Sequence, residues 1–315
     1  MNYQKILALL TGGVLILSLF SGCGQDTNQE EAVPDYPVEI SGTKVLEMPT
    51  GVVSLSPSIT QTLEELGLGG RIIGISEYCE KPDTGGETFR FQRCGTAQNP
   101  DLAAIRRTGA KVVFAPDTLT NENIIKIQQM DMDVIVIPSP ASLEEVKTIC
   151  TDLFRVMWGE NEGVVRAGVW SAKFDQKLED IRSRVAQAET GLSAVYVGPA
   201  LLNIATGDTL EGQVLELLGL ENWGAPYTDF VYPKEKEVEL MPEVLFYNQL
   251  LTGDYIKSSS CYKTTPAVQN GKVFAVEASD FENRAPDSLL GAIWEMGEWL
   301  YPDAFYQEPQ PDRGY

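Results

Sequence analysis

The 315-residue sequence contains no histidine. Histidine is the usual general base at neutral pH and the commonest protein ligand for metals, so its absence excludes Ser-His-Asp and Cys-His catalytic sites. The sequence also lacks G-x-S-x-G, P-loop and G-x-G-x-x-G motifs and any C-x-x-C spacing. We therefore expect neither a hydrolase of these classes nor a nucleotide-binding protein, and we expect no metal site and no cofactor.

Basic residues are few: 24 Lys and Arg stand against 45 Asp and Glu, which gives a formal charge of −21. Phosphate recognition depends on clustered Lys and Arg, so we expect no nucleic-acid partner. The apolar content of 43% and the charged content of 22% are typical of a folded chain. The length allows two domains of ordinary size, each with its own core.

The N-terminal region contains a long apolar run, Ile6–Phe20, which is too short to cross a bilayer as a helix. The run fits the hydrophobic region of a signal peptide, and Cys23 directly after Ser21-Gly22 resembles a bacterial lipobox, whose thiol is lipidated. The polar composition of residues 24–37 predicts a flexible tether. We therefore expect a signal peptide over residues 1–22, a lipidated cysteine with its tether over 23–44, and an extracytoplasmic protein that meets the membrane through its lipid alone.

Export permits disulfides among the four remaining cysteines. Cys79 and Cys94 flank one loop-rich segment and could bridge, although sequence spacing does not define connectivity. Cys150 lies in a helical pattern and is predicted to be a buried thiol. Cys261 is the fourth of these cysteines.

A long amphipathic helix is predicted over residues 161–189. Its apolar stripe consists of Ala167, Trp170, Phe174, Leu178, Ile181, Val185 and Ala188. Asn161 can cap its start and Gly191 can end it in a left-handed conformation. At 1.5 Å per residue such a helix is about 43 Å long, enough to join two lobes. The alternative is a long core helix within one domain.

Strands alternate with helices on both sides of this helix, which predicts an α/β fold with parallel sheets. Expected strands are 52–55, 71–75, 112–115, 134–137, 194–197, 202–204, 244–247 and 273–276. Expected helices are 59–66, 121–130, 143–157, 209–218 and 287–300. We therefore predict two Rossmann-like lobes, residues 45–158 and 192–315, joined by a helix within residues 159–191. Ligands of such sheets bind at the carboxyl ends of the strands, where turn-forming segments converge on one rim.

Several ordered segments carry a family resemblance. They are Val52–Thr60, Leu66-Gly67, Ile73–Cys79, Gly95-Thr96, Asn99–Leu102, Gly207–Thr209, Leu217–Asn222, Pro266–Val273 and Arg284–Pro286. In this order they resemble the solute-binding lipoproteins of ABC importers for cobalamin and ferric siderophores, and the likeness extends from Val45 to Tyr301. The resemblance implies two α/β lobes joined by one rigid helix, the class III periplasmic-binding-protein architecture, and a permease and ATPase as partners.

Members of this family commonly carry a glutamate on the outer surface of each lobe, which docks into arginine pockets of the permease. The resemblance places the second-lobe glutamate at Glu235. The first-lobe position falls on Ala103, and Asp101 is the candidate substitute. Gln61 also stands where the family often has glutamate.

A cleft between lobes needs apolar walls and a few convergent polar groups. Candidate ligand-binding residues are Ser56, Ser58, Tyr78, Phe91, Arg93 and Pro116 in the first lobe, and Asn203, Trp223, Tyr227, Tyr247, Phe281 and Arg284 in the second. Trp223 and Tyr227 could stack on a large ring system, and the two arginines could bind anionic oxygens. The structural alternatives are turns for the strand ends, core packing for the aromatic residues and salt bridges for the arginines.

The expected function is that of a monomeric binding protein, not an enzyme, which hands a metal chelate to a permease. A corrinoid and a ferric siderophore both remain open as the ligand. Haem is third, because tyrosine could ligate its iron but histidine is absent. Bare zinc or manganese is disfavoured because related importers of these ions rely on histidine. The alternatives are a surface receptor that never docks on a permease and a hydrolase that uses Glu77 and Asp117 as paired carboxylates.

Overall fold

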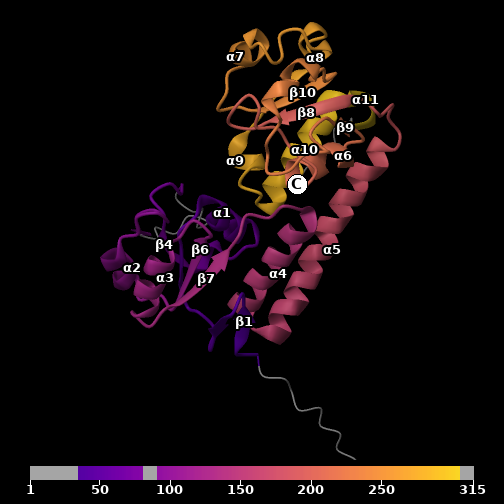
Figure 1. Cartoon of the computed structure of the whole chain (residues 1–315). Coiled ribbons are helices and arrows are strands. Elements are labelled where there is room, and N and C mark those ends of the chain that lie inside the picture. The colour runs from indigo at the N-terminus through magenta and orange to yellow at the C-terminus, as the bar shows by residue number, and fades with distance from the viewer. Residues whose placement is uncertain (1–34, 81–90, 306–315) are drawn as a thin grey trace, which may run out of the picture. The chain divides into compact units, whose positions relative to one another are not determined.

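The computed structural model describes residues 35–80 and 91–305, which belong to one compact unit, Pro34–Tyr315 (Figure 1). The predicted signal peptide, Cys23 and the tether up to residue 34 lie outside the described residues. In the described part of the chain, no helix is both long enough and apolar enough to cross a membrane.

The first lobe contains a parallel sheet with the strand order β5-β4-β3-β6-β7. Its strands are β3 (Val52–Ser54), β4 (Ile72–Ile75), β5 (Gln92–Arg93), β6 (Val112–Pro116) and β7 (Asp133–Ile137). The connecting helices are α1 (Pro57–Glu65), η1 (Gly69–Arg71), α2 (Leu102–Thr108), α3 (Asn121–Gln128) and α4 (Leu143–Trp158). The central strands β3 and β6 are buried on both faces because helices cover both sides of the sheet, as their continuous apolar sequences predict.

The second lobe contains a parallel sheet with the order β11-β10-β8-β9. Its strands are β8 (Ser193–Val197), β9 (Glu221–Asn222), β10 (Val244–Asn248) and β11 (Val273–Val276). Its helices are α6 (Leu210–Leu217), η2 (Lys234–Glu239), α7 (Gly253–Ser258), α8 (Pro266–Gln269), α9 (Ala278–Phe281), α10 (Pro286–Leu300) and α11 (Pro302–Phe305). The strand predicted over residues 202–204 is wrong, because only a single bridge pairs Ile204 with Val197.

The long connecting helix is α5, which spans Glu160–Val185 and packs along α4 (Figure 1). Its predicted apolar stripe is confirmed: five of the seven stripe residues are buried, and the other two are partly buried against the same core. Its 26 residues correspond to about 39 Å, so the predicted length was slightly too great. The predicted ends were wrong: Asn161 lies inside the first turn, and Gly191 lies beyond the end of the helix.

The start of α5 is fixed by a residue far away in the sequence. The main-chain carbonyl of Asp35 accepts a hydrogen bond from the Glu160 N–H at 2.8 Å, and its carboxylate accepts one from the Asn161 N–H at 3.2 Å. Gly159 precedes the helix with φ of 89°, and a Cβ there would lie 2.7 Å from the Asp35 carbonyl oxygen. A carboxylate at a helix N-terminus is favourable because it meets unpaired N–H groups and the positive end of the helix dipole.

Part of the predicted tether is folded. Strands β1 (Val38–Ile40) and β2 (Thr43–Val45) form an antiparallel hairpin whose inward residues are buried in the core shared with α4. The Thr43 hydroxyl donates to the Val134 carbonyl at 2.8 Å, which attaches the hairpin to β7. The predicted boundary at residue 45 is therefore corrected, because the folded unit already includes residues 38–44.

The four cysteines of the described residues are buried free thiols, so Cys79 and Cys94 do not bridge and Cys150 is buried as predicted. Burial raises the pKa of the Cys94 thiol from 9.0 to about 12 and that of the Cys261 thiol to about 11. These thiols are protonated at neutral pH. Because an unfolded thiol ionises above about pH 9 while the buried one stays neutral, their contribution to stability is present below this pH and falls as the pH rises towards 11 to 12.

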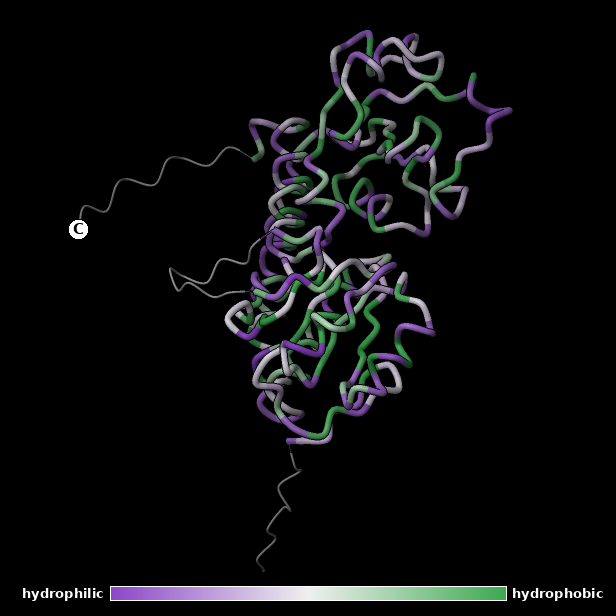
Figure 2. Tube along the Cα trace, turned by 90° about the vertical axis from the view of Figure 1, so that its left-hand side faces the viewer, coloured by the Kyte–Doolittle hydropathy of each residue, from purple (hydrophilic) through white to green (hydrophobic). Residues whose placement is uncertain are grey.

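The predicted α/β class, with two Rossmann-like lobes joined by one long helix, is confirmed. Figure 2 shows hydrophobic stretches running through the interior of each lobe and hydrophilic segments along the outside. The carboxyl ends of β3, β6 and β7 in the first lobe meet the segment between α9 and α10 of the second lobe, and this junction contains the candidate site.

Candidate functional site

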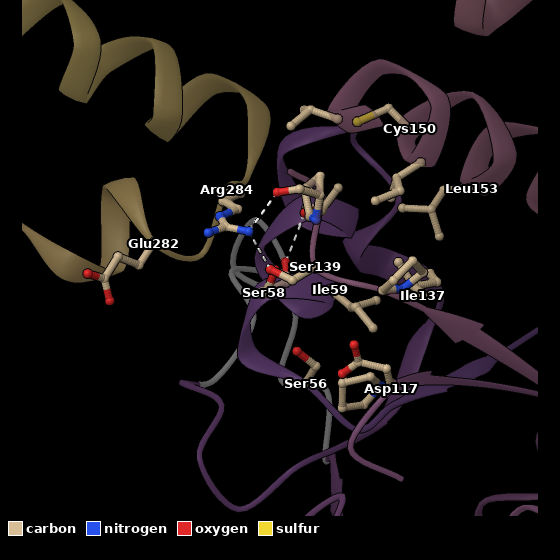
Figure 3. Close-up of a pocket in the computed structure, with 16 residues that line it drawn as sticks. Ser56, Ser58, Ile59, Asp117, Ile137, Ser139, Cys150, Leu153, Glu282 and Arg284 are labelled. Atoms are coloured by element: carbon tan, nitrogen blue, oxygen red, sulfur yellow. Dashed lines mark hydrogen bonds between the residues drawn. The ribbon is translucent and has the colours of Figure 1, made fainter. Parts of the chain in front are cut away.

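A cavity of about 190 Å³ lies where both lobes meet the carboxyl ends of β3, β6 and β7 (Figure 3). Its first-lobe lining consists of Ser56, Ser58, Ile59, Thr62, Pro116, Asp117, Ile137, Pro138, Ser139, Pro140, Val146, Ile149, Cys150 and Leu153. Glu282 and Arg284 line it from the second lobe. We call this space the inner hollow. It has an apolar wall formed largely by α4 and a polar rim formed by strand ends.

The polar rim is held by a buried network at the end of β3. Ser54 donates through its hydroxyl to the Ser56 carbonyl at 3.1 Å, and Thr60 donates to the Ser54 hydroxyl at 2.8 Å. Thr60 is also 3.2 Å from the sulfur of Cys79, which follows β4. Pro57 occupies the first turn of α1, where a missing N–H has no cost. The network therefore fixes the turn that presents Ser56 and Ser58.

Arg284 is the only cation among the described residues that line the inner hollow. One terminal nitrogen donates to the Ser139 hydroxyl at 2.7 Å and to the Pro140 carbonyl at 2.6 Å, so it links the two lobes (Figure 3). The other donates to Glu211 at 2.7 Å, and the Glu211 side chain is only 2% exposed. The arginine charge is therefore paired with a buried carboxylate behind it.

Glu282 contributes a carboxylate that is turned back into its own lobe (Figure 3). One of its oxygens accepts hydrogen bonds from the Tyr196 hydroxyl at 2.7 Å and from the Asn248 side chain at 2.6 Å. Burial, followed by the charge of Glu282, raises the pKa of Tyr196 above its ordinary value, so the phenol stays a neutral donor. Both partners are neutral side chains.

A second space, the outer hollow, lies on the other side of α1 and has a volume of about 400 Å³. Its lining consists of Pro57, Thr60, Gln61, Glu64, Tyr78, Cys79 and Glu80 from the first lobe, with Ser279, Asp280 and Asn283 from the second. The Tyr78 ring is 74% exposed. Burial, followed by the charge of Glu277, raises the pKa of the Asp280 carboxyl.

The contact between α1 and the segment before α10 separates the two hollows. Ser58 donates through its hydroxyl to the Asn283 carbonyl, and the Asn283 side chain donates to Gln61 at 2.8 Å. One turn further along α1, the Glu65 carboxylate accepts the Asp287 N–H at 2.6 Å, at the N-terminus of α10. A helix N-terminus binds a carboxylate favourably, so this contact holds the lobes together.

The structure brings five of the twelve predicted ligand residues to the hollows. Ser56, Ser58, Pro116 and Arg284 line the inner hollow, and Tyr78 lines the outer one. The four first-lobe members of this group were predicted by the strand-end rule, that is, the expectation that ligands bind at the carboxyl ends of parallel strands. Their role in binding stays a prediction.

Two predicted residues of the first lobe lie outside both hollows. Arg93 donates through one terminal nitrogen to the carbonyls of Ser76 at 2.8 Å, Glu77 at 3.3 Å and Cys79 at 2.6 Å. It therefore holds the turn after β4, and within the part of the chain that the structure describes Arg93 forms no salt bridge. Phe91 is partly buried against the core of the lobe.

The five remaining second-lobe candidates are also outside the hollows. Phe281 is 1% exposed and Tyr247 is 8% exposed, so both are core residues. Trp223 and Tyr227 are partly buried against the same cluster as Tyr247. Asn203 donates to the Phe230 carbonyl at 3.2 Å and stabilises a loop.

Apart from Arg284, sequence reasoning missed the second-lobe residues that line the hollows. Asp280, Glu282 and Asn283 follow β11 directly, so the strand-end rule would have found them if it had been applied to this strand as well. Gln61 was noted only as a departure from the family pattern.

The predicted docking residues lie on the surface. Glu235 is exposed on η2. Asp101 is exposed too, but one of its carboxylate oxygens accepts the Ala104 N–H at 2.9 Å and so caps α2. Ala103 is exposed in the first turn of the same helix.

The hydrolase alternative requires two carboxylates that face one space. Asp117 lines the inner hollow but Glu77 lines neither, so the carboxylate pair of the hydrolase alternative is not brought together in these spaces. In residues 35–80 and 91–305, no group of three or more His, Cys, Asp and Glu side chains could hold a metal ion.

A family described as periplasmic binding protein matches residues 52–279 of the chain. The chain belongs to the periplasmic binding protein family. The match runs from β3 into α9, and so includes α5, the first-lobe residues that line the hollows and Ser279 of the second lobe. The resemblance stated from the sequence is thereby confirmed.

Named relatives cover most of this periplasmic binding protein. An uncharacterized ABC transporter substrate-binding lipoprotein of Bacillus subtilis, YvrC, is 23% identical over 95% of this chain and 96% of its own. A vitamin B12-binding protein of Vibrio parahaemolyticus is 24% identical over 78% of this chain and 88% of its own. The structure of the periplasmic haem-binding protein HutB of Vibrio cholerae matches with a TM-score of 0.68 at 15% identity, and covers 80% of this chain and 99% of that one. The last likeness shows the fold alone.

Proposed function

We propose that this periplasmic binding protein is the solute-binding lipoprotein of an ABC importer, which captures a metal chelate between its lobes and delivers it to a permease. The observation that carries the proposal is the pair of hollows at the strand ends, each lined by residues of both lobes. A site shared by two lobes is suited to a ligand that both lobes enclose. The name and coverage of the Bacillus subtilis relative support the transport role and the lipid anchor at Cys23.

The ligand class is a corrinoid or a ferric siderophore. The apolar wall of Ile137, Ile149 and Leu153 suits the hydrophobic part of a large ligand, and the hydroxyls of Ser56 and Ser58 can orient its polar groups. Ligand sites usually have volumes of about 300 to 1,000 Å³. The inner hollow, at about 190 Å³, is below this range, and the outer one, at about 400 Å³, is near its lower end. A ligand of this size therefore occupies both hollows, with the Ser58 contact to Asn283 broken. The vitamin B12-binding relative favours the corrinoid.

Dialysis of a soluble form that begins at Gly24 should show saturable binding of cyanocobalamin or a ferric hydroxamate. The visible absorbance of the chelate is the readout, because among the described residues no tryptophan lines either hollow. Ser139→Trp should weaken binding at least about tenfold, because the indole would fill the inner hollow. Ser183→Trp, on the exposed face of α5, is the matched control and should bind normally.

Absence of binding to every chelate tested, with an unchanged circular dichroism spectrum, would remove the proposal. Equal binding by both tryptophan variants would place the ligand elsewhere on the protein.

The docking surfaces distinguish an importer component from a receptor that acts without a permease. Ala103→Glu should raise uptake with the native permease by up to about fivefold, because an exposed salt bridge contributes about 0 to 1 kcal/mol. Glu235→Ala should lower uptake by a similar factor. Ala172→Glu, on the exposed face of α5, is the control for added charge. The observation that favours the receptor is the exposed alanine at position 103, where the family commonly has a docking glutamate. Unchanged uptake in both docking variants would support the receptor.

A further inference from the structure

The lining of the two hollows is strongly unbalanced in charge. Among the described residues, it contains five carboxylates and one cation. The carboxylates are Asp117 and Glu282 in the inner hollow, where that of Glu282 is turned towards Tyr196 and Asn248, and Glu64, Glu80 and Asp280 in the outer one.

The single cation is already neutralised. Arg284 pairs with Glu211 at 2.7 Å, and the side chains of the two residues are 16% and 2% exposed. Its remaining terminal nitrogen is used by Ser139 and Pro140. A buried carboxylate at this distance cancels most of the field that an arginine would present to an anion. Arg284 therefore offers little attraction to a negatively charged ligand.

Arg93, the other arginine that was predicted to contact an anion, does not line either hollow. One terminal nitrogen of Arg93 donates to three backbone carbonyls of the turn after β4. Both arginines that the sequence offered as anion contacts are therefore engaged within the protein. Binding sites for polyanionic ligands use clustered Arg and Lys that can form charge-assisted hydrogen bonds, and the described lining has no such cluster.

We infer that the cleft selects by charge: it takes neutral or cationic chelates and rejects polyanionic ones. This inference rests on the proposed function, since it assumes that a chelate binds between the lobes. The carboxylates and amides of Asp280, Asn283 and Gln61 can accept hydrogen bonds from amide N–H groups or pair with a cationic arm. A ferric complex with carboxylate or catecholate groups would instead be placed beside like charges, which costs affinity.

The test compares chelates of different charge on the same soluble protein. The probes are cyanocobalamin, which is neutral, ferrioxamine B, which is cationic, and ferric enterobactin, which is polyanionic. We expect the polyanion to bind at least about tenfold more weakly than the better of the other two. The difference should shrink as salt is raised, because salt screens repulsion between exposed charges.

A charge reversal in the outer hollow separates electrostatic from steric exclusion. Asp280→Lys should reduce the difference in affinity between the polyanion and the other probes by about tenfold. Asp254→Lys should leave this difference unchanged, because Asp254 is exposed on α7 and lines neither hollow. Polyanion binding as tight as that of the other probes would overturn the inference and leave the proposed function standing. A difference in affinity that changes neither with salt nor in Asp280→Lys would overturn the inference as well. Failure of all three probes to bind would remove the proposed function itself.

Discussion

Replacement of Arg284 by methionine is expected to lower the free energy of unfolding by about 3 to 5 kcal/mol. The reason is the partner that the substitution leaves behind: Glu211 is 2% exposed, and within the described residues Arg284 is its only ion-pair partner. A buried carboxylate without its cation has neither hydrating water nor an opposite charge to stabilise it. Arg284→Met also removes the hydrogen bonds to Ser139 and Pro140 that link the lobes. Urea unfolding followed by circular dichroism measures the effect.

The double variant Arg284→Met with Glu211→Met tests this explanation. Replacing a buried ion pair by apolar residues is often nearly neutral, so the double variant should regain most of the stability that Arg284→Met loses. Arg182→Met is the matched control, because Arg182 pairs with Glu179 at 3.6 Å on the exposed surface of α5, and we expect it to stay within about 0.5 kcal/mol of the wild type. A double variant as unstable as the single one would show that the uncompensated charge is not the cause.

The fold could be predicted from the sequence because its largest elements carry strong periodic signals. The stripe from Ala167 to Val185 has the helical period over its whole length, and its burial follows directly. The short apolar runs of β3, β6 and β10 are continuous because these strands are buried on both faces. Their alternation with helices then requires parallel pairing and crossover connections.

The ends of elements were predicted less well, because they depend on contacts between distant residues. Gly159 begins α5 only because Asp35, which is far away in the sequence, supplies the capping groups. Gly191 has the left-handed φ expected of a helix end, but α5 stops earlier, at Val185. The hairpin at 38–45 was also missed, because its inward residues are few and its burial against α4 cannot be read from local composition.

The candidate site divides in the same way. Topology predicts that strand ends converge, so Ser56, Ser58 and Pro116 were found. Residue type does not distinguish an aromatic ring that binds a ligand from one that fills a core. Tyr247 and Phe281 were therefore predicted as ligand-binding residues, although both are buried. The arginines likewise could not be assigned from charge alone, since their partners are backbone carbonyls, one serine hydroxyl and one distant glutamate.

Substitution of Phe281 by alanine is the second large effect that we expect, with a loss of about 3 to 5 kcal/mol in the free energy of unfolding. Phe281 is 1% exposed, and its ring centroid lies 5.1 Å from that of Tyr196. The cavity left by its removal adjoins the tyrosine that holds Glu282, so the lost packing cannot be recovered by a simple side-chain shift. Thermal and urea unfolding should both report the loss.

Tyr78→Ala is the matched comparison, because it removes an aromatic ring that is 74% exposed in the outer hollow. Its stability should stay within about 0.5 kcal/mol of the wild type, while its affinity for the bound chelate should fall severalfold because a ligand that spans both hollows loses this contact. The folded fraction of Phe281→Ala should in contrast keep the order of preference among chelates. If Phe281→Ala were as stable as the wild type and lost binding, Phe281 would be a ligand contact after all, and the ligand would reach beyond the two hollows into the core of the second lobe.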